Sequence, residues 1–543
     1  MTAALPARWD LDIDVLVVGF GFAGGATAIA AHDAGLEALI IEKLPHPGGV
    51  SIASGGGIGM ATDADAAFQC LRAACAGRTP DDVLRALADE LVQLPDWIRS
   101  LAARSDTAFE VEEVRGDAGY DLPGREAFGW ILVRGMGEFE GFPWAKGLRG
   151  GARLFRILLD NVEDRGIPVW CEAPATELIT DANGEVLGAW VVRDGRQLAV
   201  RARRGVVLAC GGFEWAEDLK RQYFEGMPVF GVVGRGNTGD GIRMAQSVGA
   251  DLWHMWHFHG SYGFKPAGLS NPIRHTFAGP RGTTVMPWIV VDRDGRRFMS
   301  EIHPSPNDTN ARPMTGFDPD RLEYPRIPSY AIFDDHGRQL GPLGFPIRTS
   351  EADDDVEWSA DNLAEVDKGW ILQADTLGDL AGLINADGHG AHVDAAVLET
   401  TVAEWNRCVD AGHDPLFQRP ATTMLRVATP PFHAIAVWPI VSNTQGGPVH
   451  DPHRRVLDPF GRPIPRLYTA GELGSVFGHL YLLAGNIGEC FTSARQAVRH
   501  LTAMSPSDAP AAVTPAEPTN PTWASAHAEP QGDKTCDSSV PSA

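Results

Sequence analysis

The sequence lacks several features that would set it apart from ordinary globular proteins. No run of about 18 or more apolar residues occurs, so we expect no segment inserted in a membrane. The seven cysteines are scattered and form no C-x-x-C pair, which disfavours disulfides, iron–sulfur clusters and attached haem. Positive charge is also scarce, because 46 Lys and Arg stand against 70 Asp and Glu, for a net charge of −24. Nucleic acids and anionic membrane surfaces are therefore not expected partners.

The sequence does contain enough apolar material for a large folded core. With 543 residues, of which 44% are hydrophobic, the chain exceeds one ordinary domain, and two or three units are expected. The N-terminal segment MTAALPARWD has no apolar stretch of the kind found in signal peptides, so we expect a cytoplasmic location. The acidic excess predicts a well-solvated surface.

One stretch near the start, Asp12–Gly24 (DIDVLVVGFGFAG), combines an apolar run with a glycine-rich turn. The apolar run predicts a strand that is buried on both faces. Gly19, Gly21 and Gly24 then spell G-x-G-x-x-G, and an Ala-rich helix follows. In such a turn the first glycine permits the tight bend and the second lets a pyrophosphate approach the backbone. The third allows the helix to pack closely on the strand, with its N-terminus facing the phosphates.

A candidate acidic residue follows at the expected distance. Glu42 lies 18 residues beyond Gly24, at the end of another apolar run, where a carboxylate can bond a ribose hydroxyl. Strand, turn, helix, second strand and acid in this order predict a bound dinucleotide. The segment after Glu42, Lys43–Gly59, contains six glycines and two serines, so we expect a loop whose backbone approaches a ligand closely.

The remaining chain divides by composition. Residues 167–202 predict a β-meander with hairpin turns at Asn183-Gly184 and Asp194-Gly195. Helical spacing of apolar residues occurs at 79–100, 151–165, 377–383 and 486–501. The sequence therefore predicts an α/β protein: a Rossmann-like domain (1–244 and 429–504), an inserted α+β substrate or cap domain (245–428) and a disordered tail (505–543).

Further motifs follow the fingerprint in a fixed order: EKLPHPGGVSIASGGGIG at 42–59, GVVLACGGF at 205–213, GNTGDG at 236–241, VDRDGRRFMSE at 291–301, NTQGG at 443–447, AGELG at 470–474 and LAGNIGE at 483–489. With these motifs the chain resembles the fumarate reductase and 3-ketosteroid dehydrogenase superfamily of flavoproteins over residues 12–502. The resemblance implies that the dinucleotide is FAD.

The resemblance also implies roles for individual residues. Gly19, Gly21 and Gly24 would hold the pyrophosphate, Glu42 the adenosine ribose, and Glu472 the ribityl chain. The other implied FAD contacts are Lys43, Gly48, Gly49, Ser51, Ser54, Gly55, Gly56, Ala175, Gly211, Asp240, Asn486 and Ile487. The turn at 485–488 would aim a helix N-terminus at the flavin N1/O2 edge, where negative charge builds up when a hydride arrives at N5.

Two absences narrow the kind of flavoprotein. Respiratory members of the superfamily attach FAD through a histidine in the first glycine-rich segment, and the corresponding position here is Gly49, so the resemblance implies non-covalent FAD. The chain has one convincing G-x-G-x-x-G and no redox-active cysteine pair after it. A pyridine-nucleotide disulfide reductase is therefore not expected.

The dicarboxylate-binding positions of the superfamily are also changed. Fumarate reductases carry an arginine shortly after R-F-x-x-E, a histidine pair before T-x-G-G and an arginine before G-G-N. The corresponding positions here are Ser305, Ser442-Asn443 and Leu482. Buried substrate carboxylates facing these residues would lack charge partners, at a cost of several kcal/mol each. We therefore do not expect fumarate or succinate as the substrate.

A tyrosine and a glycine occupy the place where a ketone would bind. The segment Tyr481-Leu-Leu-Ala-Gly485 resembles the Tyr-x-x-x-Gly of 3-ketosteroid 1-dehydrogenases, in which the hydroxyl and the glycine N–H both bond the substrate carbonyl. The sequence departs from the family in two motifs. The family's Tyr-Pro-Gly is replaced by Tyr481-Leu-Leu-Ala-Gly485, and its A-G-N is replaced by Ala470-Gly471-Glu472. A tyrosine that merely packs beside the flavin is the alternative interpretation.

The proton acceptor is less well defined by the sequence. The family's base tyrosine corresponds to Ser305, which leaves Tyr120, Tyr262, His303 and His479 as candidates. A separate group, His254, His257 and His259, alternates with aromatic residues. These histidines lack an acid or cysteine at ligand spacing, so a metal site is disfavoured. An aromatic pocket wall and ordinary cap core both remain possible for this segment.

These observations predict an FAD-dependent oxidoreductase that introduces or reduces a C=C bond next to a carbonyl. The expected substrate is bulky, uncharged and hydrophobic, with a 3-ketosteroid-like ketone as the best guess, and an external electron acceptor or donor is required. One alternative is an ene-reductase acting on a small unsaturated acid, which would need a cap arginine such as Arg274 or Arg281 in its pocket. Another is a flavin electron-transfer subunit without substrate chemistry.

Overall fold

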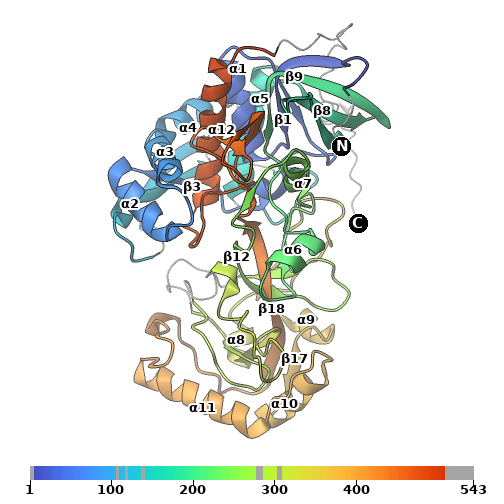
Figure 1. Cartoon of the computed structure of the whole chain (residues 1–543). Coiled ribbons are helices and arrows are strands. Elements are labelled where there is room, and N and C mark those ends of the chain that lie inside the picture. Colours follow the sequence, from blue (N-terminus) through green and yellow to red (C-terminus); the bar gives the residue numbers. More distant parts are fainter. Residues whose placement is uncertain are drawn as a thin grey trace, which may run out of the picture.

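The computed structural model describes residues 5–105, 109–115, 120–135, 141–148, 150–276, 285–302, 309–482 and 484–507. Figure 1 shows one large sheet at the top with helices α1 (Phe22–Asp33), α5 (Gly150–Asp164) and α12 (Gly485–Ala503), and the helices from α8 (Asp335–Arg338) to α11 (Ala395–Ala411) gathered at the bottom. The long strand β18 (Phe432–Thr444) runs from the middle of the molecule into the lower part. Among the described residues, no helix has the length and apolar character needed to cross a bilayer.

The first sheet is built on the apolar run near the start of the chain. Its strand order is β20-β21-β9-β1-β2-β6, and β8 pairs with both β9 and β7. The strands are β1 (Leu11–Val18), β2 (Ala38–Ile41), β6 (Val169–Trp170), β7 (Ala175–Thr180), β8 (Val186–Arg193), β9 (Arg196–Leu208), β20 (Arg455–Leu457) and β21 (Pro463–Thr469). Strand β1 pairs in parallel with β2 and β9 and is buried on both faces, as its composition predicted.

The two faces of β1 belong to different cores. Val15 and Val17 pack in the core formed with helices α1 (Phe22–Asp33), α5 (Gly150–Asp164) and α12 (Gly485–Ala503). Leu16 and Val18 pack on the other face, in a core that includes residues of α6 (Glu217–Tyr223) and α7 (Asp240–Ser247). The alternation follows from the two-residue period of a strand. The α/β fold is therefore the predicted one.

A small third sheet lies beside this body. It has the order β3-β5-β4, with β3 (Ile58–Ala61), β4 (Phe109–Arg115) and β5 (Phe128–Gly135). Helices α2 (Ala64–Cys75), α3 (Asp81–Leu91) and α4 (Leu94–Ala102) lie between β3 and β4 in the chain. Strand β3 touches the start of α12, since the Gly59 N–H donates to the Ala484 carbonyl at 3.0 Å. A two-stranded pair joins β11 (Leu252–Trp253) and β19 (Gly447–Pro448).

The second large sheet forms the cap and is centred on β18 (Phe432–Thr444). Its order is β14-β15-β18-β12-β13-β16, and β10 and β17 also pair with β18. The other strands are β10 (Phe230–Gly231), β12 (Phe258–Phe264), β13 (Ile273–His275), β14 (Ile289–Val291), β15 (Ser329–Asp334), β16 (Gly344–Phe345) and β17 (Leu372–Ala374). The cap helices are α8 (Asp335–Arg338), α9 (Leu363–Asp367), α10 (Leu377–Ala386) and α11 (Ala395–Ala411). Single 3-10 turns occur at Gly49–Ala53, Arg125–Ala127, Thr309–Ala311 and Ala421–Thr423.

The strand pairing extends the cap sheet beyond the predicted cap domain, residues 245–428. Strands β10 and β18 lie outside 245–428, yet both pair within the cap sheet. The reason is that an apolar strand such as Phe432–Thr444 has a composition suited to either sheet, so its partner cannot be predicted from composition. The chain returns to the first sheet only at β20 and β21.

Several local predictions are confirmed. The meander β7–β8–β9 has its turns where expected, with Gly184 at φ 80° and Asp194 and Gly195 at φ 50° and 70°. The helical periodicities correspond to α3, α4, α5, α10 and α12. The first residues of the predicted tail are ordered against the first body, because the Ser507 N–H donates to the Arg203 carbonyl at 2.7 Å. Residues 508–543 lie outside the described part of the chain.

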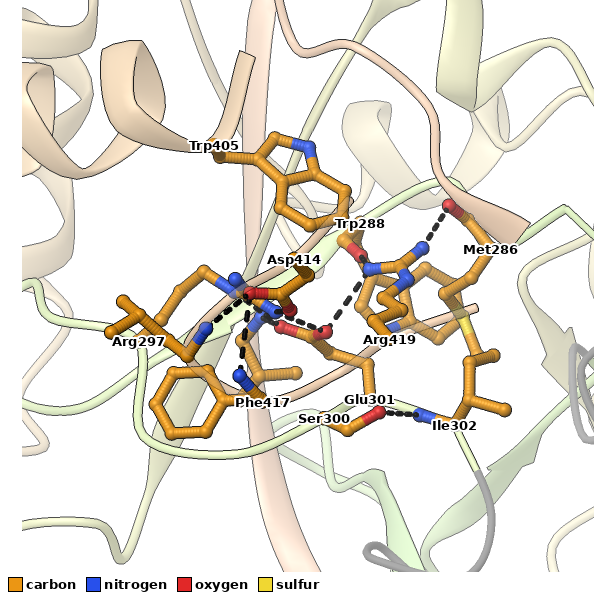
Figure 2. Close-up of polar contacts among 12 residues, drawn as sticks. Met286, Trp288, Arg297, Ser300, Glu301, Ile302, Trp405, Asp414, Phe417 and Arg419 are labelled. Carbon is orange, nitrogen blue, oxygen red and sulfur yellow. Dashed lines mark hydrogen bonds and ion pairs between the residues drawn. The ribbon is translucent and has the colours of Figure 1, made fainter. Parts of the chain in front are cut away.

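The motif VDRDGRRFMSE holds the cap together through buried charges. Glu301 accepts from Arg297 at 3.0 Å and from Arg419 at 3.1 Å, and Arg297 also bonds Asp414 at 3.1 Å. Figure 2 shows Glu301 between the two arginines, with the Trp405 ring beside both guanidinium groups. Although burial opposes ionisation of Glu301, the charges of Arg297 and Arg419 lower its pKa. This charge cluster (Arg297, Glu301, Asp414 and Arg419) ties β14 to the segment after α11.

Candidate functional site

Two cavities meet where the carboxyl ends of β1, β2 and β9 approach the N-termini of α1 and α12. The first is lined by Gly19, Gly21, Glu42, Lys43, Gly48, Gly49, Ala175, Gly211 and Asp240, the second by Ser54, Gly55, Gly56, Asn486 and Ile487, and both by Ser51 and Glu472. Every predicted cofactor residue except Gly24 thus lines a cavity. Their empty space, counting the mouths, is about 840 and 1110 Å³. The shared residues place the two cavities side by side, and we call them the cofactor cleft and the second cavity.

The fingerprint glycines leave room for a ligand and for close packing. Gly19 has φ 103°, and a Cβ there would lie 2.6 Å from the Ala209 carbonyl oxygen. At Gly21 a Cβ would lie 2.8 Å from the Ser51 Oγ, at the cavity wall. Gly24 serves packing alone, because a Cβ there would lie 1.9 Å from the Gly19 carbonyl oxygen. The turn at Gly19 and the close packing at Gly24 fit the roles that the spacing predicted, and the role of Gly21 toward a pyrophosphate stays a prediction.

The acid after β2 is held by backbone donors. Glu42 accepts from the Phe20 N–H at 3.0 Å and from the Leu44 N–H at 2.9 Å. Burial raises the pKa of this carboxyl, and the backbone donors oppose the rise. The next residue, Lys43, bonds Asp240 at 2.6 Å and so connects the end of β2 to the start of α7. This bond closes one side of the first cavity.

A second buried carboxyl lies where the two cavities join. Glu472 accepts from the Thr444 N–H at 2.8 Å, and Glu214 accepts from the same N–H at 3.2 Å. Burial, followed by the charge and hydrogen bond of Glu214, raises the pKa of Glu472 well above its ordinary value. The carboxyl of Glu472 therefore holds a proton more readily than an ordinary glutamate does.

The second cavity contains the predicted tyrosine. Tyr481 is 8% exposed and its hydroxyl accepts from the Asn486 N–H, at the start of α12, at 3.4 Å. The ring lies 4.3 Å from that of His259, measured between centroids, and both side chains line the cavity. Burial raises the pKa of Tyr481, so its hydroxyl stays protonated and can donate a hydrogen bond.

The predicted role of Gly485 is not supported by its contacts. The Gly485 N–H donates to the Leu482 carbonyl at 2.9 Å, and Gly485 is not among the residues that line the second cavity. A Cβ at this glycine would lie 2.3 Å from the Phe477 ring, so packing explains the residue type. The N–H that points to Tyr481 belongs to the next residue, Asn486.

The candidate bases lie elsewhere. Tyr262 is fully buried in the cap core and accepts from the Trp288 indole N–H at 3.0 Å, so its placement argues against a catalytic role. Tyr120 packs against the first core. The His479 carbonyl accepts from the Thr309 hydroxyl at 2.7 Å. None of these three is among the described residues that line the second cavity. His303 and Ser305 fall outside the described part of the chain.

The histidine-rich segment supports the loop that carries Tyr481. The His254 Nδ1 lies 2.8 Å from the Ser475 carbonyl oxygen, and the His257 Nδ1 lies 2.6 Å from that of Phe477. Burial lowers the pKa of both imidazoles, so they are neutral donors. No group of His, Cys, Asp and Glu suited to a metal occurs in the part of the chain that the structure describes. His259 alone of the three lines the second cavity.

Sequence reasoning missed how the cap closes the second cavity. Its cap wall consists of Val232, Val233, His259, Arg274, Ile347, Ser442 and Asn443. Strand pairing brings them together, since His259 on β12 is opposite Asn443 on β18. Arg274 on β13 donates to the Ser442 Oγ at 3.4 Å. The signals in the sequence were the changed Ser442-Asn443 pair, the candidate pocket arginine Arg274 and the histidine-rich segment with His259, but nothing in the sequence showed that they meet.

The model of the FAD binding domain family matches residues 14–487. The chain belongs to this family. It is 26% identical to the 3-oxosteroid 1-dehydrogenase of Comamonas testosteroni, over 90% of this chain and 96% of the relative. It is 28% identical to the 4-oxocyclohexanecarboxylate 2-dehydrogenase of Sinomonas cyclohexanicum, over 84% of this chain and 87% of the relative. The structure of the 3-ketosteroid Δ1-dehydrogenase of Sterolibacterium denitrificans superposes with a TM-score of 0.75 at 25% identity, covering 91% of this chain and 99% of the other. The protein is an FAD-dependent oxidoreductase.

Two observations fit FAD to the cleft. The glycine cradle at Gly19 and Gly21 lies at the N-terminus of α1, where backbone N–H groups suit a pyrophosphate. At the other end Asn486 is 7% exposed, and neither its amide oxygen nor its nitrogen has a partner among the described residues. Such orphaned polar atoms suit the polar edge of a flavin ring. Gly49 in the first cavity offers no side chain for a covalent link.

Proposed function

We propose that the protein introduces or reduces a C=C bond next to the carbonyl of a ketone, with Tyr481 bonding the carbonyl oxygen. The observation that carries the proposal is the buried Tyr481 hydroxyl, which accepts from the Asn486 N–H at the start of α12 in a cavity that adjoins the cofactor cleft. When bound, FAD supplies the acceptor for the hydride that leaves the β carbon.

The chain's own residues would stabilise the oxygen. Removal of a proton next to a ketone makes an enolate-like oxygen, and a hydrogen-bond donor aimed at it lowers the barrier. Tyr481 is the donor, and the Asn486 N–H at the start of α12, which donates to the Tyr481 hydroxyl, would hold that hydroxyl in place. The positive end of the α12 dipole favours negative charge there. The proton acceptor is not assigned to any described residue.

The substrate class follows from the wall of the second cavity. Val232, Val233 and Ile347 present apolar side chains, and two relatives are named for 3-oxosteroid or 3-ketosteroid substrates. A 3-ketosteroid-like or other ring ketone is the proposed substrate. An external electron acceptor or donor completes the cycle, because each turnover transfers two electrons.

A second candidate is reduction of an unsaturated acid, and the observation that favours it is Arg274 in the second cavity. Arg281, the other arginine considered, lies outside the described residues. Against this candidate, the positions that bind dicarboxylates in fumarate reductases are Leu482 and Ser442-Asn443 here. One relative is named for 4-oxocyclohexanecarboxylate, which is a ring ketone and a carboxylate in one molecule.

Anaerobic flavin spectroscopy tests the proposal. The holoenzyme is mixed with saturated ketosteroids and cyclohexanones, and the reduced enzyme with the matching enones and with fumarate. Bleaching by a saturated ketone, or reoxidation by an enone, supports carbonyl-directed chemistry. Reoxidation by fumarate with no response to any ketone or enone supports the acid reductase. A flavin that responds to none of them indicates an electron-transfer subunit.

A further inference from the structure

The proposed chemistry places one hydrogen-bond donor, the Tyr481 hydroxyl, at the substrate carbonyl. The neighbouring backbone N–H groups are engaged elsewhere, because Gly485 donates to the Leu482 carbonyl at 2.9 Å and Asn486 donates to the Tyr481 hydroxyl at 3.4 Å. An enolate-like oxygen accepts more than one hydrogen bond, and each donor aimed at it lowers the barrier. A side chain in the wall of the second cavity can supply a second donor.

Asn443 lies in that wall and has a buried donor atom. It is the last residue but one of β18, and it lines the second cavity. Its Nδ2 is buried and has no hydrogen-bond partner among the described residues. A buried N–H group without a partner is costly, so the great majority of such groups in native structures meet a partner. The ligand of the second cavity is the partner that Asn443 would meet.

Strand pairing brings Asn443 toward Tyr481. His259 on β12 is paired directly with Asn443 in the antiparallel cap sheet, so these two side chains lie on the same face. The His259 ring in turn lies 4.3 Å from the Tyr481 ring, measured between centroids. All three residues line the second cavity. The Asn443 amide and the Tyr481 hydroxyl are thus each next to one imidazole, one on the cap sheet and the other on the segment before α12.

We propose that the Asn443 side-chain amide is the second donor to the carbonyl oxygen of the substrate, beside the Tyr481 hydroxyl. The inference rests on the proposed function, because it assigns a second group to the same oxygen. The same enolate forms in either direction, by loss of the proton next to a saturated ketone or by hydride addition to the β carbon of an enone. In both cases negative charge gathers on this oxygen, and two donors stabilise it better than one. A carboxamide suits the role because it is neutral and its nitrogen has two N–H donors.

The kinetic test uses Asn443→Leu, which keeps the size of the side chain and removes the donor. Wild-type and variant holoenzymes are mixed anaerobically with a ring ketone that reduces the wild-type flavin. At saturating ketone the bleaching rate should fall about 100-fold, while the half-saturating concentration changes by less than about threefold. Asn443→Gln, which keeps an amide donor, should recover part of the rate. The control is Gln339→Leu, an exposed carboxamide after α8, which should change neither value.

Binding of 2-naphthol separates this inference from the proposed chemistry. Its anion mimics the enolate and has a single oxygen, and binding is followed by the perturbation of the oxidised flavin spectrum without turnover. Asn443→Leu and Tyr481→Phe should each weaken 2-naphthol by about 10-fold or more, and neither should weaken 2-methoxynaphthalene by more than about threefold. If both losses occur while no ketone bleaches the flavin, the donor pair stands and the proposed reaction fails. Unchanged 2-naphthol binding in Asn443→Leu, with or without a rise in half-saturating ketone, would overturn the inference.

FAD content and circular dichroism are measured for every variant. Loss of FAD from Asn443→Leu and Asn443→Gln alike would also overturn the inference, because it would assign Asn443 to the cofactor site.

Discussion

The cofactor cleft and the cap wall of the second cavity are built in different ways. The cleft is lined by several glycines, of which Gly19 and Gly21 stand where a side chain would strike a carbonyl or a hydroxyl, and Gly24 packs behind them. The cap wall is made of side chains from β12, β13 and β18, which meet through strand pairing. Backbone geometry tolerates few substitutions, whereas side chains on a stable sheet can change more freely. We therefore expect substitutions in the cleft to affect FAD binding and substitutions in the cap wall to affect substrate choice.

The first prediction adds a side chain at Gly24, behind the cofactor cleft. Gly24→Val should abolish FAD binding, because its Cβ would have to occupy a point 1.9 Å from the Gly19 carbonyl oxygen. The measurement is the FAD content of the purified protein, with circular dichroism to check folding. Gly382→Ala, in the cap helix α10 with no atom within 4 Å of the added Cβ, is the control. Full FAD content in Gly24→Val would show that the close packing of α1 on the turn is not required.

The second prediction removes charge from the cap core. Glu301→Gln leaves Arg297 and Arg419 without their shared carboxylate, so it should lower the free energy of unfolding by about 3–5 kcal/mol. Urea unfolding followed by tryptophan fluorescence measures the change. The control is Glu404→Gln, whose 56% exposed side chain pairs with Arg407 at 3.8 Å and should change stability by less than about 0.5 kcal/mol. Similar small effects for both variants would mean that the charge cluster does not hold the cap.

The third prediction concerns the Glu214–Glu472 pair and has the smallest effect. Burial and the neighbouring Glu214 raise the pKa of Glu472, so ionising it costs the folded state. Stability of the apo-protein should therefore fall as pH rises above the ordinary glutamate value of 4.5 toward the raised one. Glu214→Gln removes one cause of the shift, so its Tm should decline less between pH 5 and pH 8. A decline as steep as that of the wild type would contradict the pairing.

The same contrast explains what the sequence could predict. Gly19, Gly21 and Glu42, which the spacing predicted to meet a dinucleotide, lie together at the first cavity because their positions depend on local spacing along one strand, turn and helix. The contact between Arg274 and Ser442 could not be predicted, because these residues lie far apart in the sequence and pairing in the cap sheet brings them together. The sequence also could not show where the Gly485 N–H points, because the left-handed conformation of Ala484 (φ 60°) and the bond to Leu482 decide it. Tyr262 was a candidate by residue type alone, and its burial excludes it from the cavity wall.

The most direct test of the account is the rate of flavin bleaching in Tyr481→Phe. Wild-type and variant holoenzymes are mixed anaerobically with a saturating ring ketone that reduces the wild-type flavin, and the flavin absorbance is followed by stopped flow. We expect the variant to contain the same amount of FAD with the same spectrum. Its bleaching rate should be lower by about 100-fold or more, because one donor to the developing oxyanion is lost. Bleaching at the wild-type rate would contradict the claim that Tyr481 directs the chemistry at the carbonyl.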